Sequence, residues 1–431
     1  MRRMKRRGAV VLSAGLLAGG LATAGATAAE DDPTRPTEVA GFTGVVGGDI
    51  GGNEIDRSAL ADPSNVSTRI WNGRTAVPGQ HPSNVFIYFE DDTTSWVCGG
   101  AVVHRRLILT AAHCTFGATY SQVFSGGTTW PTDLSDSAWV PSLANWWATA
   151  YDPSGFGVND VGLVEMSTDI GAPPIPIQPP AGPAHLETGG TLSVVAGWGL
   201  LGPGQTISQD LQTTHVPQRA AADCGALDPL YYDEAFNICA GFATSEAPQP
   251  TGSCQGDSGS PLMSYDRHGP TVVGLVSYGF GECTDLDSFG FYMRASAYYD
   301  NVDGFLTGSY GEGLPAPPAP KKCNGVTATH AGTVGNDVIV GRAVRDVIVG
   351  LDGGDQITGL GGDDLLCGNG GNDIANGGGG GDTLNGHSGR DTLRGNAGRD
   401  NFKGGPGRDI CNGGPGLDGP APGCERKISI P

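Results

Sequence analysis

A serine, a histidine and an aspartate of this chain lie in short segments whose residue types suit nucleophilic catalysis. Ser258 follows Gly-Asp and precedes Gly-Ser-Pro, and His113 follows Thr-Ala-Ala and precedes a cysteine. A serine hydroxyl is a weak nucleophile until a neighbouring imidazole accepts its proton. Asp160, which stands directly before an apolar run, is the candidate for the carboxylate that holds this imidazole in the required tautomer. The chain order His, Asp, Ser is one of three known orders for such a triad.

Each of the three residues alone has an ordinary explanation. A single histidine is usually only a polar residue, and an aspartate before an apolar strand usually belongs to a turn. Their occurrence together with the segment Gly-Asp-Ser-Gly at 256–259 favours a catalytic site.

From about residue 70 to about residue 306 the chain resembles the chymotrypsin/trypsin family of serine peptidases. The resemblance rests on the segments around His113, Asp160 and Ser258. It implies hydrolysis of peptide bonds through an acyl-enzyme, with Ser258 as nucleophile, His113 as general base and then general acid, and Asp160 as the group that orients the imidazole. The backbone N–H groups of Gly256 and Ser258 would form the oxyanion hole.

The same part of the chain has the pattern of an all-β fold. Short apolar runs, such as residues 85–89, 192–195 and 271–276, alternate with clusters of Gly, Pro, Asn and Asp. This pattern predicts a sandwich or a barrel. The family resemblance narrows the prediction to two antiparallel six-stranded β-barrels with the active site between them, closed by a C-terminal helix over residues 295–306.

A propeptide is predicted over residues 29–69, which are rich in Asp, Thr, Pro and Gly. It ends in Arg69, and Ile70 follows, as in the family's mature chains, although the next two residues depart from the family's pattern. The resemblance implies a zymogen that is activated by cleavage after Arg69. The new ammonium group of Ile70 would then pair with the carboxylate of Asp257 and order the oxyanion loop.

Glycines are expected to shape the specificity pocket. Gly252, six positions before Ser258, stands where trypsin-like members carry an aspartate, and Gly279 and Gly290 match the pocket walls. Because the base of the pocket carries no acid, we expect a preference for large apolar or aromatic P1 residues. An acidic side chain among residues 282–287 would reverse this preference if it reached the pocket. Self-activation is not expected, and a separate trypsin-like peptidase would make the activating cut.

The amino terminus predicts export. Residues 1–28 contain a basic start, an apolar stretch and small residues of a cleavage site, which is the pattern of a secretory signal peptide. No other apolar run suggests a membrane span. A net charge of -20 makes nucleic acid an unsuitable partner, so the expected partners are protein or peptide substrates in an extracellular setting.

Ten cysteines fit an oxidising compartment and allow up to five disulfides. The family resemblance implies three pairs in the protease region, Cys98 with Cys114, Cys224 with Cys239, and Cys254 with Cys283. The other four cysteines lie in or beside the C-terminal region, where we expect Cys323 with Cys367 and Cys411 with Cys424.

Repeats dominate the chain after a Pro-rich spacer. The expected division is a protease domain over 70–310, a linker over 311–322 and a repeat domain over 323–431. From residue 332 glycine recurs every nine residues and aspartate holds the sixth place of each unit, while the eighth place is mostly aliphatic. This pattern matches the RTX nonapeptide repeat. Arrays of such repeats resemble calcium-binding parallel β-rolls.

Calcium is the expected cofactor of these repeats, and none is expected for catalysis. Gly-rich turns expose carbonyl oxygens and each aspartate adds a hard anionic oxygen, which together suit Ca²⁺. Two repeats make one coil, so aspartates eighteen residues apart should stack in two columns. The second unit contains Arg342 and Val344 and makes a poor loop. The expected ligands are Asp337, Asp355, Asp364, Asp373, Asp382, Asp391, Asp400 and Asp409.

A second class of function remains open from the sequence. In it the repeats are the functional part, the chain adheres to a surface or polymer in a calcium-dependent manner, and the protease domain is degenerate. A disordered Gly/Asp linker is disfavoured, because both the nine-residue period and the aliphatic positions are kept.

Overall fold

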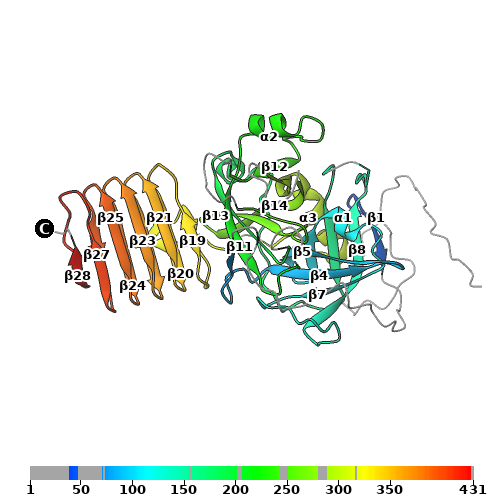
Figure 1. Ribbon diagram of the computed structural model, residues 1–431, viewed down its shortest axis with the longest axis horizontal. Coiled ribbons are helices and arrows are strands. Elements are labelled where there is room, and N and C mark those ends of the chain that lie inside the picture. The colour runs from blue at the N-terminus through cyan, green and yellow to red at the C-terminus, as the bar shows by residue number, and fades with distance from the viewer. Residues whose placement is uncertain are drawn as a thin grey trace, which may run out of the picture. The chain divides into compact units, whose positions relative to one another are not determined.

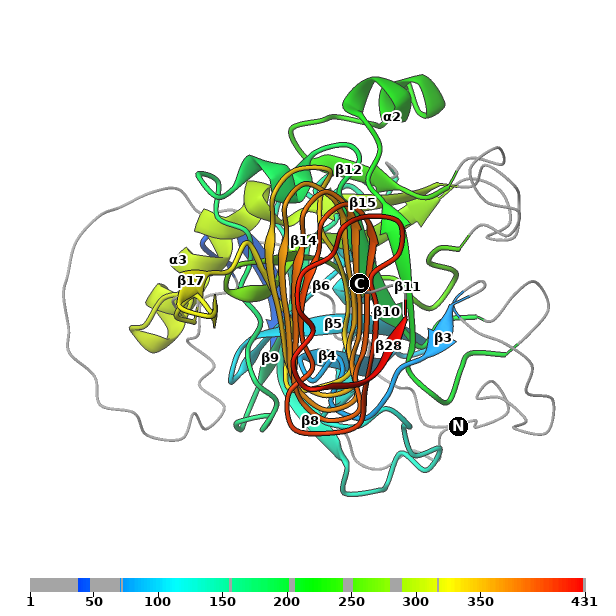
Figure 2. The same ribbon diagram turned by 90° about the vertical axis from the view of Figure 1, so that its left-hand side faces the viewer.

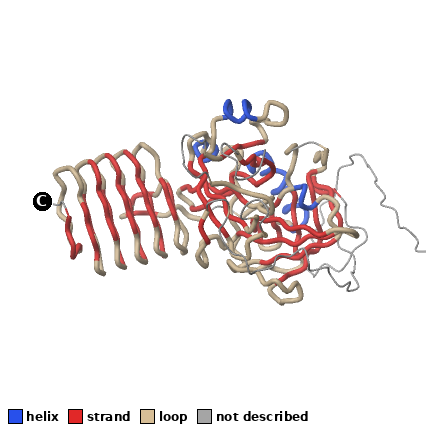
Figure 3. Tube along the Cα trace, in the orientation of Figure 1, coloured by secondary structure: helices blue, strands red, loops and turns tan. Residues whose placement is uncertain are grey.

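The computed structural model describes residues 38–46, 70, 73–154, 157–200, 206–242, 251–279, 289–315 and 318–428. All of them belong to one compact unit that spans residues 36–431. The predicted signal peptide, most of the predicted propeptide and Arg69 lie outside the described residues. Strands predominate and helices are few (Figure 3).

The first barrel consists of six antiparallel strands in the order β7, β4, β5, β6, β9, β8, and pairing of β8 with β9 closes it. Its centre is apolar, with fully buried side chains such as Phe86 and Trp146. The strands are β4 (Asn84–Glu90), β5 (Ser95–His104), β6 (Leu107–Thr110), β7 (Tyr120–Phe124), β8 (Trp139–Ala148) and β9 (Gly162–Met166).

The second barrel has the strand order β12, β15, β14, β13, β10, β11, and the short β3 (Arg74–Thr75) pairs with the outer edge of β11. A bridge between Gln218 and Ala240 joins the two outer strands, which closes the barrel. The strands are β10 (Leu192–Gly197), β11 (Gln212–Pro217), β12 (Asn237–Ala240), β13 (Pro261–Asp266), β14 (Gly269–Gly279) and β15 (Gly290–Arg294). The two predicted six-stranded barrels are confirmed.

The described residues of the protease part also form short helices: α1 (Ala112–Thr115), η2 (Ala184–Glu187), α2 (Ala221–Leu227), η3 (Ala295–Tyr298) and α3 (Tyr299–Tyr310). The last two correspond to the predicted closing helix. Phe305 of α3 is fully buried and packs edge-on against Trp146 of β8, which anchors the helix to the first barrel. None of the described helices is both long and apolar enough to cross a membrane.

The predicted propeptide contains ordered structure that the sequence pattern did not reveal. Residues 38–46 form a hairpin of β1 (Glu38–Val39) and β2 (Phe42–Val46), and β2 pairs antiparallel with β8 (Figure 1). These segments are too short to show a periodicity of their own. Their strand conformation depends on pairing with a strand that lies about a hundred residues further along the chain.

The C-terminal repeats form a parallel β-roll, as predicted. Up to β27, strands pair in parallel with the strand eighteen residues further on, so successive coils lie directly over one another (Figures 1 and 2). One sheet contains β18 (His330–Ala331), β20 (Val347–Asp352), β22 (Leu365–Gly370), β24 (Thr383–Ser388) and β26 (Asn401–Lys403). The other contains β19 (Val338–Val340), β21 (Gln356–Gly361), β23 (Ile374–Gly379), β25 (Thr392–Ala397), β27 (Asp409–Asn412) and β28 (Cys424–Ile428).

A single ladder of side chains fills the interior of the roll. They come from the eighth place of each repeat, and each is at most 3% exposed: Ile339, Ile348, Ile357, Leu366, Ala375, Leu384, Leu393, Phe402 and Cys411. Since this core is narrow, disulfides add cross-links at both ends. Cys323 of the small hairpin β16 (Lys322–Cys323) and β17 (Val326–Thr327) bonds Cys367, and Cys411 bonds Cys424.

Candidate active site and calcium sites

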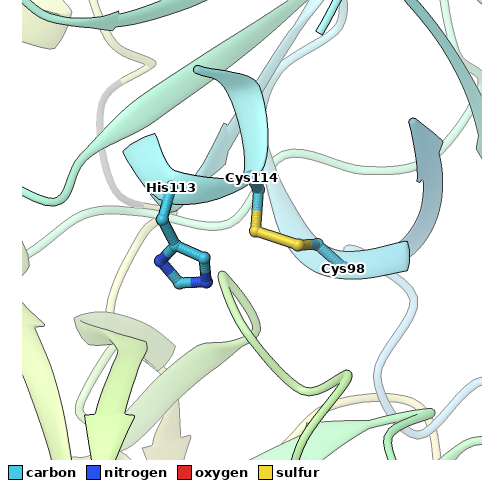
Figure 4. A group of neighbouring side chains, drawn as sticks. All are labelled: Cys98, His113 and Cys114. Atoms are coloured by element: carbon cyan, nitrogen blue, oxygen red, sulfur yellow. A yellow bond between two sulfur atoms is a disulfide. The ribbon is translucent and has the colours of Figure 1, made fainter. Parts of the chain in front are cut away.

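His113 lies on the single turn α1, which a disulfide attaches to the neighbouring strand. Cys114, the next residue, bonds Cys98 of β5 (Figure 4), and the indole of Trp96 donates to the carbonyl of Cys114 at 2.9 Å. The imidazole lies close to both sulfurs. Because each sulfur is bonded to the other, neither is available as a thiolate ligand, and this cluster serves to hold the histidine in place.

Asp160 binds His113 twice. Its Oδ2 lies 2.8 Å from Nδ1 of His113, and its Oδ1 accepts the backbone N–H of the same residue at 2.8 Å. The hydroxyl of Ser277 donates to Oδ2 at 2.5 Å. The Asp160 side chain is 3% exposed, whereas the His113 side chain is 33% exposed. The carboxylate therefore fixes both the position and the tautomer of the imidazole and leaves Nε2 free of this contact.

The two groups shift each other's pKa. Burial alone would lower the pKa of His113, but the charge of Asp160 and its hydrogen bond outweigh burial and raise that pKa. Burial would raise the pKa of Asp160, but His113 and the Ser277 hydroxyl outweigh it and lower that pKa. The pair is thus arranged to stabilise an imidazolium beside a carboxylate.

Sequence reasoning missed the partners that hold Asp160. Ser277 is 117 positions away in the chain. Asn159 has a positive φ of 53°, and its side chain accepts the hydroxyl of Tyr298 at 2.7 Å. No local pattern predicts these contacts, because they arise only when the two barrels meet.

Backbone contacts place Ser258 beside the histidine segment. Its carbonyl accepts the N–H of Gly99 at 2.8 Å, next to the disulfide on β5. Gly259 follows with a positive φ of 76°, and a Cβ there would lie 2.1 Å from Oγ1 of Thr110 and 2.9 Å from the backbone nitrogen of Ala111. Only glycine allows this close approach of the serine turn to the residues that precede His113.

The N–H groups expected to form the oxyanion hole are available. The N–H groups of Asp257, Gly259 and Ser260 all donate to backbone carbonyls. Within the described part of the chain, those of Gly256 and Ser258 have no such acceptor. Gly256 has a φ of 89°, which bends the backbone at this turn. Two free donors beside a candidate nucleophile are what stabilisation of a tetrahedral oxyanion requires.

Asp257 is completely buried behind this turn. Its Oδ1 accepts the N–H of Gly199 at 2.7 Å and its Oδ2 accepts the N–H of Cys254 at 2.9 Å. Burial raises the pKa of Asp257 to about 7, and the two N–H donors only partly oppose it. Ile70, the other residue expected in activation, is also completely buried.

The pocket glycines differ in the space around them. A Cβ at Gly252 would meet no atom within 4 Å, and one at Gly279 would meet only the carbonyl of Phe289 at 3.5 Å. A Cβ at Gly290 would lie 3.0 Å from the hydroxyl of Tyr292. The acidic residues at 282–287 lie outside the described residues.

The disulfides in the protease region follow the expected pairs as far as they are described. Cys98 bonds Cys114, and Cys224 bonds Cys239. Cys254 is also disulfide-bonded, and its expected partner, Cys283, lies outside the described residues. The described cysteines include no free thiol.

Comparison with known sequences now places the domain. The sequence model of the trypsin family matches residues 70–302, more than half of the chain. The chain belongs to the trypsin family of serine endopeptidases. A chymotrypsin from Phaedon cochleariae is 27% identical over 237 residues, which cover 54% of this chain and 80% of that protein.

Two larger proteins share the trypsin-family domain. Limulus clotting factor C from Carcinoscorpius rotundicauda is 28% identical over 60% of this chain, and coagulation factor XII from Cavia porcellus is 29% identical over 54%. The aligned parts cover only 28% and 39% of those two proteins. The likeness to them is therefore confined to one domain.

The RTX calcium-binding nonapeptide repeat matches four segments between residues 331 and 419, so the C-terminal region is a calcium-binding repeat domain. Its aspartates stack eighteen residues apart, as expected. From Asp355 onward, the Oδ1 atom of each accepts the backbone N–H of the aspartate one coil before it, as Asp373 does from Asp355 at 2.8 Å. Eight of their buried Oδ2 atoms have no hydrogen-bond donor: those of Asp355, Asp364, Asp373, Asp382, Asp391, Asp400, Asp409 and Asp418.

These orphaned oxygens fit a bound cation. The opening glycine of each repeat leaves the space beside them empty, since a Cβ at Gly350 would lie 2.2 Å from Oδ2 of Asp355. Burial raises the pKa of Asp355 to about 8 and that of Asp373 to about 7. Buried, unpaired carboxylate oxygens facing a carbonyl-rich turn are the donor set that Ca²⁺ prefers.

The first two aspartates of the roll differ from the others. Asp337, an expected ligand, accepts the hydroxyl of Tyr265 at Oδ1 and two donors from Thr333 at Oδ2. Asp346, in the repeat expected to make a poor loop, holds the guanidinium of Arg342 at 2.6 Å. Protein donors thus satisfy these carboxylates. Asp418, which was not among the expected ligands, has the same orphaned oxygen as the central aspartates.

Proposed function

We propose that this protein hydrolyses peptide bonds with Ser258 as nucleophile, His113 as general base and Asp160 as the positioning carboxylate. The observation that carries the proposal is the double hydrogen bond between His113 and Asp160, at the end of a segment packed against the Ser258 turn. His113 would accept the proton of the Ser258 hydroxyl as that oxygen attacks the carbonyl carbon. It would then donate the proton to the leaving amine, and water would release the acyl group by the same steps in reverse.

The N–H groups of Gly256 and Ser258 would stabilise the oxyanion of each tetrahedral intermediate. Loss of one such donor typically costs about 10²–10³ in rate. Both are backbone groups of a turn in which Gly256 and Gly259 have positive φ. Once this turn is fixed, they need little reorganisation during the reaction.

We infer that the enzyme is made as a zymogen. Asp257 is buried, and no ion pair to it is found among the described residues. A buried carboxylate is costly to ionise without a cation. Cleavage after Arg69 would release the ammonium of Ile70 as that cation, and the pair would fix the neighbouring oxyanion turn.

We propose a preference for large apolar or aromatic P1 residues. The absence of a side chain at Gly252, together with the open space around its Cβ position, supports a deep pocket without a charge at this position. A chain that prefers such residues would not cut after Arg69, so a separate peptidase with trypsin-like specificity would activate it.

Export and calcium complete the proposed function. The amino-terminal pattern of residues 1–28 and the disulfides support an extracellular enzyme. Extracellular calcium would stabilise the repeat domain through the orphaned aspartate oxygens. The proposed ligands are the aspartates of both columns from Asp355 to Asp418, whereas Asp337 and Asp346 are held by protein donors.

Covalent labelling tests the catalytic assignment. Protein cut after Arg69 is treated with a fluorophosphonate, and the modified residue is located by peptide mass spectrometry. The proposal expects one label, on Ser258, and at least a hundredfold slower labelling in His113→Ala. Equal labelling rates in the two proteins, or a label on another serine, would remove the basis of the assignment.

A further inference from the structure

We infer that the segment Glu38–Val46 stays bound to the enzyme after activation, as a small second chain held without a covalent bond. The inference rests on the proposed cleavage after Arg69, which would separate this segment from the protease domain. Residues 29–69 contain no cysteine, so no disulfide within this predicted propeptide can retain it. Retention must come from the contacts of β1 and β2.

The backbone of β2 is built into the sheet of the first barrel. Five consecutive residues pair antiparallel with residues 144–148 of β8, from Phe42 opposite Ala148 to Val46 opposite Ala144. The other side of the same stretch of β8 pairs with β9. Loss of β2 would leave a strand edge with unpaired N–H and C=O groups, which is unfavourable for a soluble protein.

Phe42 anchors the segment in the protein core. Its side chain is completely buried and meets the ring of Phe305 of α3 edge-on, with centroids 6.1 Å apart. Phe305 in turn contacts Trp146 of β8 at 5.2 Å. Two residues further along, a Cβ at Gly44 would lie 2.4 Å from the Trp146 ring, so the backbone of β2 rests directly on the indole. The segment therefore fills space that would otherwise be an apolar hollow.

The turn of the hairpin fits a flat face of α3. Ala40 and Gly41 both have positive φ, 50° and 84°, which is the geometry of a two-residue type I′ turn. Gly304 and Gly308 lie one turn apart on α3. A Cβ added there would lie 3.2 Å from Cβ of Ala40 and 3.5 Å from Cγ1 of Val39, respectively. These glycines let the hairpin lie against the helix.

Polar contacts fix the hairpin at the same place. The amide of Asn301 on α3 donates to the carbonyl of Ala40 at 3.0 Å, and the N–H of Thr149 donates to the carbonyl of Gly41 at 2.7 Å. The hydroxyls of Thr43 and Thr149 lie 3.0 Å apart. Together with the buried ring and the ladder, these contacts make the segment a specific ligand of the protease domain. Figure 1 shows the hairpin in dark blue beside β8.

The test is to cut the folded full chain and ask whether the segment remains. Brief treatment with trypsin can sever the connection at Arg57 or Arg69, both of which lie between the hairpin and the protease domain. The product is passed over a gel-filtration column in native buffer, and the protease peak is denatured and weighed by mass spectrometry. We expect the fragment that contains residues 38–46 to elute with the protease domain in a one-to-one ratio. Its elution as a free peptide would overturn the inference.

Variants test the mode of binding. Phe42→Ala should speed release of the fragment by roughly 100-fold or more, because it removes a fully buried ring. Val45→Thr is the matched control on the same strand, since Val45 is 38% exposed, and it should leave release unchanged. If the alanine variant does not fold, Phe42→Leu takes its place. It keeps most of the buried volume and should speed release by about tenfold. Equal release rates in all of these proteins would contradict the assigned contacts.

The experiment distinguishes failure of this inference from failure of the proposed activation. The mass of the protease fragment shows whether the cut followed Arg69, and a peptide assay shows whether that cut produced activity. A retained fragment on an inactive product would refute the activation step alone. A released fragment on an active product would refute the inference alone.

Discussion

Asp257→Asn should leave the triad intact and remove most of the activity. The pKa of Asp257 is raised by burial from 3.8 to about 7 in the uncut chain. At about 1.4 kcal/mol per pKa unit, keeping this carboxylate ionised without a cation costs about 4 kcal/mol. The ammonium of Ile70 would recover this cost after cleavage. The size agrees with the about 3–5 kcal/mol that loss of one partner of a buried pair usually costs.

In protein cut after Arg69, the asparagine variant should therefore lose about two to four orders of magnitude in kcat/KM. Asp266→Asn is the matched control, because Asp266 is a buried aspartate of the same barrel whose carboxylate accepts the backbone N–H of His268 in the neighbouring turn. The assay is steady-state hydrolysis of a chromogenic peptide, with cleavage after Arg69 verified by mass spectrometry. Near-normal turnover by the fully cut Asp257→Asn protein would refute the activation mechanism.

In the uncut chain, the ionised carboxylate of Asp257 should lower the stability of the fold, because no ammonium pairs with it. Because the folded-state pKa is raised, the folded state loses stability as pH rises from 3.8 through about 7. Urea titrations of the uncut wild type should reveal this loss, and the asparagine variant should show less of it. If Asp257 instead raised the free energy of unfolding of the wild type as pH rises from 3.8 to about 7, the burial argument would be contradicted.

The activity of the cut enzyme should fall as pH drops through the pKa of His113, which lies above its ordinary value, because only neutral imidazole accepts the serine proton. Asp160→Asn should move the acidic limb of the pH profile of kcat/KM to lower pH, and a move to higher pH would contradict the role of Asp160. Gly252→Asp should raise cleavage after Arg or Lys, relative to cleavage after Phe, by about tenfold or more, since the space at Gly252 is open. If the ratio of these two rates, measured with competing peptides, did not change, residue 252 would lie outside the pocket. Removal of calcium with a chelator should lower the melting temperature of the repeat domain, because each site contributes about 2.7 kcal/mol when free calcium is in hundredfold excess over the dissociation constant. A melting curve that is the same with chelator and with millimolar calcium would argue against the orphaned oxygens as ligands.

The fold was predictable where a strong pattern repeats. The nine-residue period predicted the roll and the stacking of aspartates, because each repeat makes the same contacts as the next. The barrels were predictable only with the family resemblance, since alternating short apolar runs do not distinguish a barrel from a sandwich.

Contacts that depend on distant segments were not predictable from the sequence. The hairpin of β1 and β2 lies within a region that has a propeptide's composition, and its structure depends on β8 and α3. Tyr265 of the second barrel satisfies Asp337, which otherwise has the same place in its repeat as the calcium ligands. The residues of a repeat do not reveal a hydrogen-bond donor that another part of the chain supplies.

The most direct test of the central claim is steady-state hydrolysis of a peptide set that varies only at P1, by protein cut after Arg69 and by the same protein with Ser258→Ala. Cleavage after Phe, Tyr or Leu that is absent from the alanine variant is the predicted result. Cleavage after Arg or Lys would retain the triad but contradict the uncharged pocket. Equal, negligible rates in both proteins, with the cut verified, would contradict the assignment of Ser258 as the nucleophile of a peptidase.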